Sequence, residues 1–367
     1  MKVAVIGNGI VGATTSYILS KNDNVAVTQF DSAKGQATSA SAGIIAPWLS
    51  KRRNKKWYRL AREGAAFMNQ LAHDTKMPSS VYREDGVVYS RKTENDIDDL
   101  LELGQERKVD ATLMGQLQKL SPTMMQEKFP FTQISDWGLF VEGGATIDGQ
   151  KFVAYLNQQT DFEQQYLNKT VSISNEKGRL SINGVAFDKV VLAVGAWLPQ
   201  CLESIGWTVH VRPQKGQLIE VQLSDEKVDS LIGLPVLMPE GERDFIPTNK
   251  NTLIIGATHE NDEGFDLSRS QVVMDDLLKS GQNLIPNLTE ADIIGYRVGT
   301  RAYTNDFAPF FGELEDNSNI YVASGLGSSG LTTGPIIGQM LAKQVLGEDI
   351  EMSEYTNPVN NYIDKRG

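Results

Sequence analysis

Short apolar runs, with a helix-length stretch between them, mark the start of the chain. Residues 3–6 form an apolar run that ends at a glycine, and residues 25–30 form a second run. Apolar runs of this length, bounded by glycine, are typical of strands that are buried in a parallel sheet. The pattern predicts a strand, a helix and a second strand, which is the order of a βαβ unit.

Two later segments have apolar residues at helical spacing. The first covers residues 57–71, and the second, with an acidic polar face, covers residues 95–106. Buried strands are expected at residues 189–194, in the same sheet as the first unit, and at residues 319–323, where a glycine cluster and an apolar helix through Leu346 follow. A strand, a glycine turn and a helix therefore occur at both ends of the chain, and we expect the two ends to meet at one site.

The middle of the chain predicts a second sheet, since residues 217–221 and 252–257 have the composition of strands separated by proline- and glycine-containing turns. The expected fold class is α/β with α+β: a Rossmann-like nucleotide-binding domain and a second, mixed-sheet substrate-binding domain. The predicted division of the chain is residues 1–75, 145–212 and 295–367 for the first domain, and residues 76–144 and 213–294 for the second.

The first glycines form a motif with chemical meaning, because Gly7, Gly9 and Gly12 are followed at the end of the second strand by Asp31. Gly7 would allow a tight turn, Gly9 a close approach of the backbone to a pyrophosphate, and Gly12 close packing of the helix on the sheet. The helix N-terminus attracts phosphates, and Asp31 is placed to bind a ribose hydroxyl. The alternative is a plain glycine-rich turn, but strand, helix and acid together predict a dinucleotide site.

Composition and charge exclude several classes of function. The 367 residues carry a net charge of −11, which excludes nucleic acid as a partner, because phosphate backbones are held by clustered Lys and Arg. With one cysteine, Cys201, and three histidines far apart, we expect neither an internal disulfide nor a bound metal. No apolar run has the length of a membrane helix, and we expect a cytoplasmic protein without an integral membrane segment.

One basic run, residues 51–56, contrasts with the acidic composition. Most runs of this kind form solvated faces. The alternatives are that the run steers an anionic substrate or touches an acidic membrane surface.

Several motifs, taken in order, resemble those of the FAD-dependent amino acid oxidases of the glycine oxidase, D-amino acid oxidase and sarcosine oxidase type. Single motifs are weak, but their shared order and spacing over nearly the whole chain make the resemblance specific. It implies FAD as the cofactor and a small amino acid as the substrate. The motifs are the first glycine loop with Asp31, residues 36–47, residues 190–197, Lys215-Gly216-Gln217, Gly256-Ala257-Thr258, the segment from Arg301 to Gly312, and Gly325-x-Gly327-x-x-Gly330.

The resemblance also implies which residues contact FAD. Small residues after Asp31 would run beside the flavin, where bulky side chains would block it. The helix that begins near Gly330 would point its amide groups at the pyrimidine side, where reduction places negative charge. Val171, expected in a strand of residues 170–173, would contact the adenine. The plain alternatives are a small-residue loop, a packing turn and a core valine. The expected set is Gly7, Gly9, Ile10, Val11, Gly12, Asp31, Ser32, Thr38, Ser39, Ala42, Gly43, Ile44, Val171, Gly195, Trp197, Arg301, Gly327, Ser328, Ser329, Gly330, Leu331 and Thr332.

Arg301 matches the position at which relatives hold the substrate carboxylate. A lone arginine is usually a surface cation, but an arginine fork gives two parallel charge-assisted hydrogen bonds to a carboxylate. In a strand of residues 293–303, Arg297, Gly299, Arg301 and Tyr303 would share one face, with Gly299 leaving space beside both guanidinium groups. We expect Arg301 to be the anchor, Arg297 a structural or auxiliary residue, and Tyr303 a further catalytic residue.

His259 falls where glycine oxidase relatives carry an apolar residue beside the substrate. It would hydrogen-bond the substrate and govern specificity, or merely end a strand. The aromatic residue that helps hold the carboxylate in glycine oxidases is Asp244 here, so Phe245, Tyr296 or Tyr303 would serve instead, or no residue would.

The last glycine loop also departs from the family pattern. The arginine and asparagine of relatives are Ser328 and Ser329, and the histidine before them is Leu326. The substrate therefore need not be glycine.

The expected reaction is oxidation of the C–N bond of a small amino acid (a D-amino acid, glycine or N-methylglycine) by hydride transfer from Cα to the flavin. The imine would hydrolyse to a keto acid, and electrons would pass to O2, giving hydrogen peroxide, or to a quinone-type acceptor. The alternatives are an oxygen-insensitive D-amino acid dehydrogenase that docks at a membrane, a nicotinamide-dependent dehydrogenase, and a nucleotide-binding protein without amino acid oxidation. The amino acid, its chirality and the oligomeric state, a homo-oligomer included, stay open.

Overall fold

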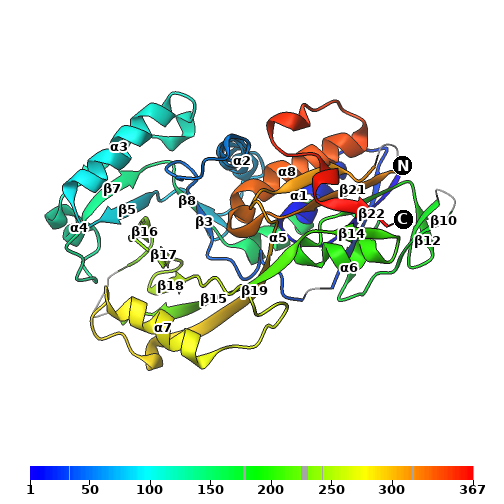
Figure 1. The fold of residues 1–367 in the computed structure, drawn as a ribbon. Helices are drawn as coiled ribbons and strands as arrows, with labels where there is room; N and C mark the ends of the chain where they lie inside the picture. Colours follow the sequence, from blue (N-terminus) through cyan, green and yellow to red (C-terminus); the bar gives the residue numbers. More distant parts are fainter. Residues whose placement is uncertain (33, 177–178, 225–229, 242, 316–317, 367) are drawn as a thin grey trace.

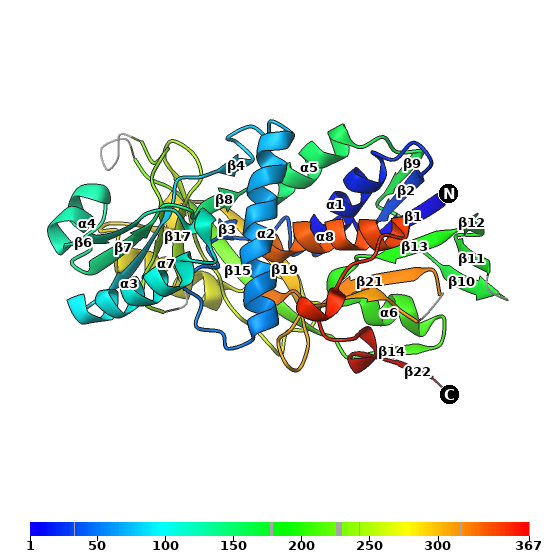
Figure 2. The ribbon, with the colours of Figure 1, turned by 90° about the horizontal axis from the view of Figure 1, so that it is seen from above.

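The computed structural model describes residues 1–366 with the exception of 33, 177–178, 225–229, 242 and 316–317. Its two largest sheets lie at opposite ends of the molecule, and the long helix α2 (Lys55–Asp74) runs between them (Figure 2). The expected fold class is confirmed, since one sheet is largely parallel, as in Rossmann-like domains, and the other is mixed.

The first sheet contains the strands that the apolar runs predict at residues 3–6, 25–30, 189–194 and 319–323. Its strands, in spatial order, are β20 (Phe310–Glu313), β21 (Ile320–Ser324), β13 (Lys189–Leu192), β1 (Lys2–Ile6), β2 (Ala26–Asp31) and β9 (Gln164–Leu167). All neighbours run parallel except β20 and β21. Side chains on both faces of β1, β2, β13 and β21 are buried, which explains the nearly continuous apolar sequence of these strands.

The second sheet contains the strands predicted at residues 217–221, 252–257 and 293–303. Its strands, in spatial order, are β19 (Ile293–Tyr303), β15 (Arg212–Gln222), β18 (Thr252–Gly256), β17 (Asp244–Pro247), β16 (Val236–Met238), β5 (Val87–Arg91), β7 (Trp137–Val141) and β6 (Leu117–Leu120). The domain boundary predicted at residue 295 lies inside β19, which pairs with β15 as far as Tyr303. Thr300 of β19 also bridges to Gln36, so this strand touches both halves of the molecule.

The helices predicted at residues 57–71 and 95–106 are confirmed as α2 and α3, each a few residues longer. The side chain of Asn54 caps α2, and that of Thr93 caps α3, each by accepting a hydrogen bond from a backbone amide of the first turn. The other helices are α1 (Ile10–Leu19), α4 (Pro122–Lys128), α5 (Gly149–Gln159), α6 (Leu198–Glu203), α7 (Gln271–Gln282) and α8 (Gly330–Leu346), and α3 covers Glu94–Lys108.

Helices α1 and α8, from the two ends of the chain, pack against each other beside the parallel sheet (Figure 1). A Cβ atom at Gly338 would lie 2.8 Å from the carbonyl oxygen of Val11, which shows how closely the two backbones approach. Leu60 of α2 and Leu341 of α8 are completely buried in the same core. The core therefore joins both ends of the chain to the central helix.

Smaller sheets complete the fold. They are β3 (Ile44–Ile45), β8 (Ala145–Ile147) and β4 (Tyr82–Arg83); β10 (Ile173–Glu176), β11 (Arg179–Ile182) and β12 (Val185–Phe187); and β14 (Trp207–Val209) with β22 (Ile363–Lys365). The strand predicted at residues 170–173 begins only at Ile173, so Val171 lies in the preceding loop. Among the helices of the described residues, none has the length and apolar character needed to cross a membrane.

Candidate functional site

A cavity of about 1000 Å³ is lined by residues from both large sheets. Its wall includes the turn between β1 and α1, the turn before α8, and residues of β5, β17, β18 and β19. This volume is at the upper end of the range for ligand pockets. Both ends of the chain and the mixed sheet therefore contribute to one site.

The first glycine turn has the shape that its sequence predicts. Gly7 has a φ angle of +99°, and a Cβ atom there would lie 2.3 Å from the carbonyl oxygen of Ala193. A Cβ atom at Gly12 would lie 1.8 Å from the carbonyl oxygen of Gly7. Larger residues would push α1 away from the sheet, so these glycines bring the N-terminus of α1 to the cavity.

Asp31 and Thr38 shape the same end of the cavity. The carboxylate of Asp31 accepts hydrogen bonds from the backbone amide of Asn8 at 3.0 Å and from Nε2 of Gln36 at 2.6 Å. Thr38 Oγ1 accepts a hydrogen bond from the amide of Ile10, the first residue of α1, at 3.0 Å. These contacts hold a carboxylate beside a helix N-terminus, which is the arrangement expected for a ribose next to a pyrophosphate.

The second glycine turn lies at the start of α8, where a 3-10 helix, η4 (Gly327–Ser329), leads directly into the α-helix. The Tyr303 hydroxyl accepts a hydrogen bond from the amide of Ser328 at 3.1 Å. Nε1 of Trp57, on α2, donates a hydrogen bond to Ser329 Oγ at 3.1 Å. The turn is thus held by β19 on one side and by α2 on the other.

Most of the residues predicted from the sequence line this cavity. They are Gly7, Gly9, Ile10, Val11, Asp31, Ser32, Thr38, Ala42, Gly43, Ile44, Val171, Gly195, Trp197, His259, Arg301, Gly327, Ser328, Ser329, Gly330, Leu331 and Thr332. Three predicted residues lie outside its wall. Gly12 packs against the first turn, Ser39 donates its hydroxyl hydrogen bond to Gln36 Oε1, and Tyr303 is buried behind Ser328.

Arg301 enters the cavity wall from β19. Its Nη1 donates hydrogen bonds to the carbonyl oxygen of Thr258 at 2.7 Å and to Gln214 Oε1 at 3.1 Å. Among the described residues, the hydrogen bonds of this guanidinium all come from Nη1, which leaves Nη2 and Nε for a ligand. Burial lowers the pKa of the Arg301 guanidinium, as expected for a desolvated cation.

The sequence suggested that Gly299 leaves the space beside Arg301. In the structure this space comes from Gly216 of β15. A Cβ atom at Gly216 would lie 2.8 Å from the guanidinium, whereas one at Gly299 would meet Ala40. Arg297 forms an ion pair with Glu220 and donates a hydrogen bond to the carbonyl oxygen of Ser41. Because the cross-strand partner cannot be read from one strand, period-two alternation alone assigned the wrong glycine.

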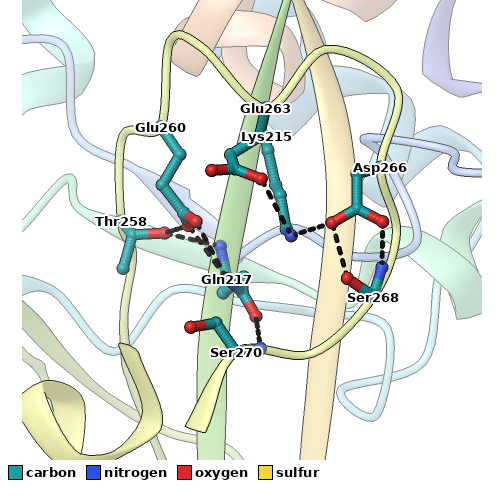
Figure 3. Close-up of polar contacts among 8 residues, drawn as sticks. All are labelled: Lys215, Gln217, Thr258, Glu260, Glu263, Asp266, Ser268 and Ser270. Carbon is teal, nitrogen blue, oxygen red and sulfur yellow. Dashed lines mark hydrogen bonds and ion pairs between the residues drawn. The ribbon is translucent and has the colours of Figure 1, made fainter. Parts of the chain in front are cut away.

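A polar network on β15 positions the loop of residues 258–270, which carries His259 (Figure 3). Gln217 Nε2 donates to the Glu260 carboxylate, and Gln217 Oε1 accepts from the Ser270 amide. Thr258 Oγ1 accepts from the Gln217 amide at 2.9 Å. Because the Thr258 carbonyl in turn accepts from Arg301, this network fixes one side of the arginine.

Lys215 anchors the middle of the same loop (Figure 3). The side chain of Lys215 is only 2% exposed, and its Nζ lies 2.6 Å from Asp266 Oδ2. The ion pair, with hydrogen bonds from the hydroxyl and amide of Ser268, lowers the pKa of Asp266 well below its usual range. The sequence identified Lys215 and Gln217 only as a family motif, and the structure shows their contacts.

Several residues of the cavity wall were not predicted as site residues, among them Arg52, Trp57, Tyr89 and Arg91. Arg52 belongs to the basic run of residues 51–56. Its neighbours Lys51 and Arg53 are exposed, as on a solvated face, but the Arg52 side chain is half-buried. Its guanidinium stacks on the ring of Trp57 at 4.5 Å. An arginine five positions before a tryptophan at a helix start is too weak a signal to predict this contact.

Asp244, at the position where the resemblance implies an aromatic residue, lines the cavity. Burial raises the pKa of its carboxyl from the usual value to about 7. Of the predicted aromatic substitutes, neither Phe245 nor Tyr296 lines the cavity, and Tyr303 lies behind it. A titrating carboxyl thus takes the place of an aromatic side chain.

The wall fits a dinucleotide with a flat ring system. The N-termini of α1 and α8 both open on the cavity, which provides two sets of amide donors for anionic groups. Small residues such as Ala40, Ala42 and Gly43 line the stretch between them. The charge and the amide donors of the residues present therefore fit FAD.

Comparison with known proteins supports this assignment. The model of the family described as FAD dependent oxidoreductase matches residues 2–344. The chain is 32% identical to the uncharacterized oxidoreductase YurR of Bacillus subtilis, over 95% of both chains, and 24% identical to a glycine oxidase of Geobacillus kaustophilus, over 94% of this chain and 92% of the relative.

Its fold is similar to that of iminodiacetate oxidase from Chelativorans sp. BNC1, with a TM-score of 0.89, 28% identity, and coverage of 96% of this chain and 98% of the other. The family match, the glycine turns and the cavity agree. FAD is the cofactor that this family uses. The chain belongs to the family of FAD-dependent oxidoreductases.

Proposed function

We propose that this enzyme oxidises the C–N bond of an amino acid with a primary or N-substituted amine. The observation that carries the proposal is Arg301, a buried guanidinium with two nitrogen atoms left for a ligand, in the wall of the cofactor cavity. Among the similar proteins, glycine oxidase and iminodiacetate oxidase are both named for amines that carry carboxylate groups. Their names support an amino carboxylate as the substrate here.

In this proposal six residues near the cavity have defined roles. Arg301 would hold the substrate carboxylate through Nη2 and Nε, because a planar fork fixes the orientation of the ligand as well as its position. Asp244 would face the amine and, when ionised, take a proton from it. FAD, when bound, supplies a two-electron acceptor. Gly7, Gly9, Asp31 and Thr38 would hold its nucleotide half.

The amine loses two electrons and two protons and becomes an imine, which water hydrolyses to a carbonyl product and an amine or ammonia. We propose O2 as the final acceptor, which takes up the same two electrons and two protons as hydrogen peroxide. A quinone-type acceptor is the alternative. Peroxide release with one equivalent per amine oxidised supports O2, whereas turnover with a quinone but without peroxide supports the dehydrogenase.

Replacement of Arg301 by leucine tests the proposed role. Loss of two charge-assisted hydrogen bonds should raise the KM for the amino acid by at least about 100-fold. FAD content should stay unchanged, because the predicted nucleotide contacts lie elsewhere. R301K, which keeps the charge but not the fork, should fall between R301L and the wild type. Steady-state kinetics with glycine, N-methylglycine, D-alanine and iminodiacetate, together with the flavin absorbance, provide the measurement.

Arg269→Leu is the matched control, because Arg269 is exposed and does not line the cavity. Its KM should match the wild type. An R301L enzyme with an unchanged KM would remove Arg301 from the site. If no amino acid reduces the bound flavin under anaerobic conditions, the proposed reaction is wrong.

A further inference from the structure

The wall of the cavity is cationic although the chain as a whole carries a net charge of −11. Its described cationic residues are Arg52, Arg91 and Arg301, together with Lys34 and Lys169. Among the described lining residues, the acidic groups are Asp31, at the nucleotide end, and Asp244. Because burial raises the pKa of Asp244 to about 7, its carboxyl is half protonated near neutral pH and balances little of this positive charge.

Arg52 is held at the turn before α8. Its guanidinium stacks on Trp57, and the indole of Trp57 is hydrogen-bonded to Ser329. Among the described residues, no carboxylate lies within ion-pair distance of Arg52, although Arg59 and Arg62 of the following helix both have acidic partners. Arg52 therefore presents a half-buried cation, packed in place, to the cavity.

Arg52 and Arg301 approach the cavity from different elements, the loop before α2 and strand β19. Contacts with one turn bring them to the same region: Arg52 stacks on Trp57, which binds Ser329, and Tyr303, two residues after Arg301 on β19, binds the amide of Ser328. Nη1 of Arg301 is occupied by protein acceptors, so its remaining fork accommodates a single carboxylate. A second anion in this cavity needs a second cation.

We propose that Arg52 forms a second anion subsite, so that the substrate is an amino acid carrying a second carboxylate. The inference rests on the proposed function, in which Arg301 holds the first carboxylate. A desolvated guanidinium without an anionic partner is unfavourable, and a substrate carboxylate would supply the missing partner. The second carboxylate is carried either by the nitrogen substituent, as in iminodiacetate, or by the side chain, as in D-aspartate.

Binding of unreactive analogues to the FAD-loaded enzyme tests the subsite without turnover. Thiodiacetate and methylthioacetate have sulfur in place of the amine nitrogen, so neither forms an imine, and they differ by one carboxylate. Changes in flavin absorbance measure both dissociation constants. We expect thiodiacetate to bind about 10- to 100-fold more tightly, the range expected for one charge-assisted contact. Equal affinities in the wild type overturn the inference, whatever any variant does.

Arg52→Gln removes the charge and should bring the two affinities to within about twofold of each other, with little change for methylthioacetate. Arg53→Gln is the matched control, since Arg53 is the exposed neighbour in the same run and does not line this cavity. It should keep the preference for thiodiacetate. An R52Q enzyme that keeps the full preference overturns the assignment to Arg52.

Turnover measurements with paired amines distinguish the two possible positions of the second carboxylate. Together with the binding measurements they also distinguish failure of the second subsite from failure of the proposed reaction. Preference for iminodiacetate over N-methylglycine places the group on nitrogen, and preference for D-aspartate over D-asparagine places it on the side chain. If the paired amines react equally and the paired analogues bind equally, the oxidase function stands and the second subsite falls. If no amine reacts but thiodiacetate is preferred, the subsite stands and the proposed reaction falls.

Discussion

Asp244 is the residue whose chemistry differs most from the resemblance that the sequence suggests. A carboxyl stands at a position where the resemblance implies an aromatic residue, and burial raises the pKa of this carboxyl to about 7. A raised pKa means that the group is protonated and neutral below about pH 7 and ionised above it. The site therefore changes charge in the range where an enzyme at neutral pH operates.

The pH dependence of kcat/KM should report this titration. Because only the ionised carboxylate attracts a substrate ammonium and accepts its proton, kcat/KM should rise as pH increases through about 7. Asp244→Asn should remove this limb and leave any limb at higher pH that belongs to the substrate amine. Asp275→Asn, at an exposed position of α7, should behave like the wild type. Identical profiles for D244N and the wild type would show that Asp244 has no such role.

For single residues, the sequence predicts local backbone geometry well and contacts between distant segments poorly. The conformation of Gly7 and the packing of Gly12 depend on neighbouring backbone, and both were expected. Ser39 was expected at the flavin, but its hydroxyl bonds Gln36. The environment of Arg52 depends on Trp57, Ser329 and Tyr303, which come from three elements, whereas composition favoured a solvated face for its run and left substrate steering and a membrane surface as alternatives.

At the scale of elements, the loop of residues 258–270 links the site to β15. Its first residues touch Arg301, its middle is paired with Lys215, and Phe265 packs on Trp197 of the cavity wall with ring centroids 5.1 Å apart. The loop has no regular secondary structure between β18 and α7 apart from an isolated bridge, so these side-chain contacts determine its position.

Lys215→Met should release the loop with little loss of global stability. Methionine fills a buried site of similar length without the cost of a desolvated charge, and Asp266 is exposed enough to be solvated after the change. We expect the KM for the amino acid to rise several-fold, kcat to change less, and amide exchange to increase in residues 258–270. Lys279→Met, at an exposed position of α7, is the control. Unchanged KM and exchange would show that the ion pair does not order the loop.

Element positions were largely predictable because apolar periodicity is a local property. The strand expected at residues 293–303 matches β19, and the long helix matches α2 within a few residues. The predicted division between domains stays a prediction. Its boundary at residue 295 falls within strand β19, which pairs with β15 over its length and also bridges to Gln36.

At the scale of the whole molecule, both ends of the chain close one cavity. Helix α1 carries the first glycine turn and α8 the second, and the two helices cross at Gly338. Thr15 Oγ1 donates a hydrogen bond to the Gly338 carbonyl oxygen at 3.2 Å. The separation of these helices therefore sets the distance between the two groups of amide donors that would hold the cofactor.

Gly338→Ala should disturb this crossing. The added Cβ atom would lie 2.8 Å from the Val11 carbonyl oxygen and 2.9 Å from Thr14 Cβ, and neither backbone can move without shifting a helix. Overpacking of this kind costs about 1–3 kcal/mol, so Tm should fall. Gln339→Ala, at the partly exposed next position, should leave Tm close to the wild type.

Because a ligand stabilises the folded state by mass action, added FAD should raise the Tm of the wild type and of G338A. The increase should be smaller in G338A if the displaced α1 terminus binds FAD more weakly. A G338A protein with wild-type Tm and FAD affinity would mean that the crossing tolerates a methyl group and that helix separation does not control the cofactor site.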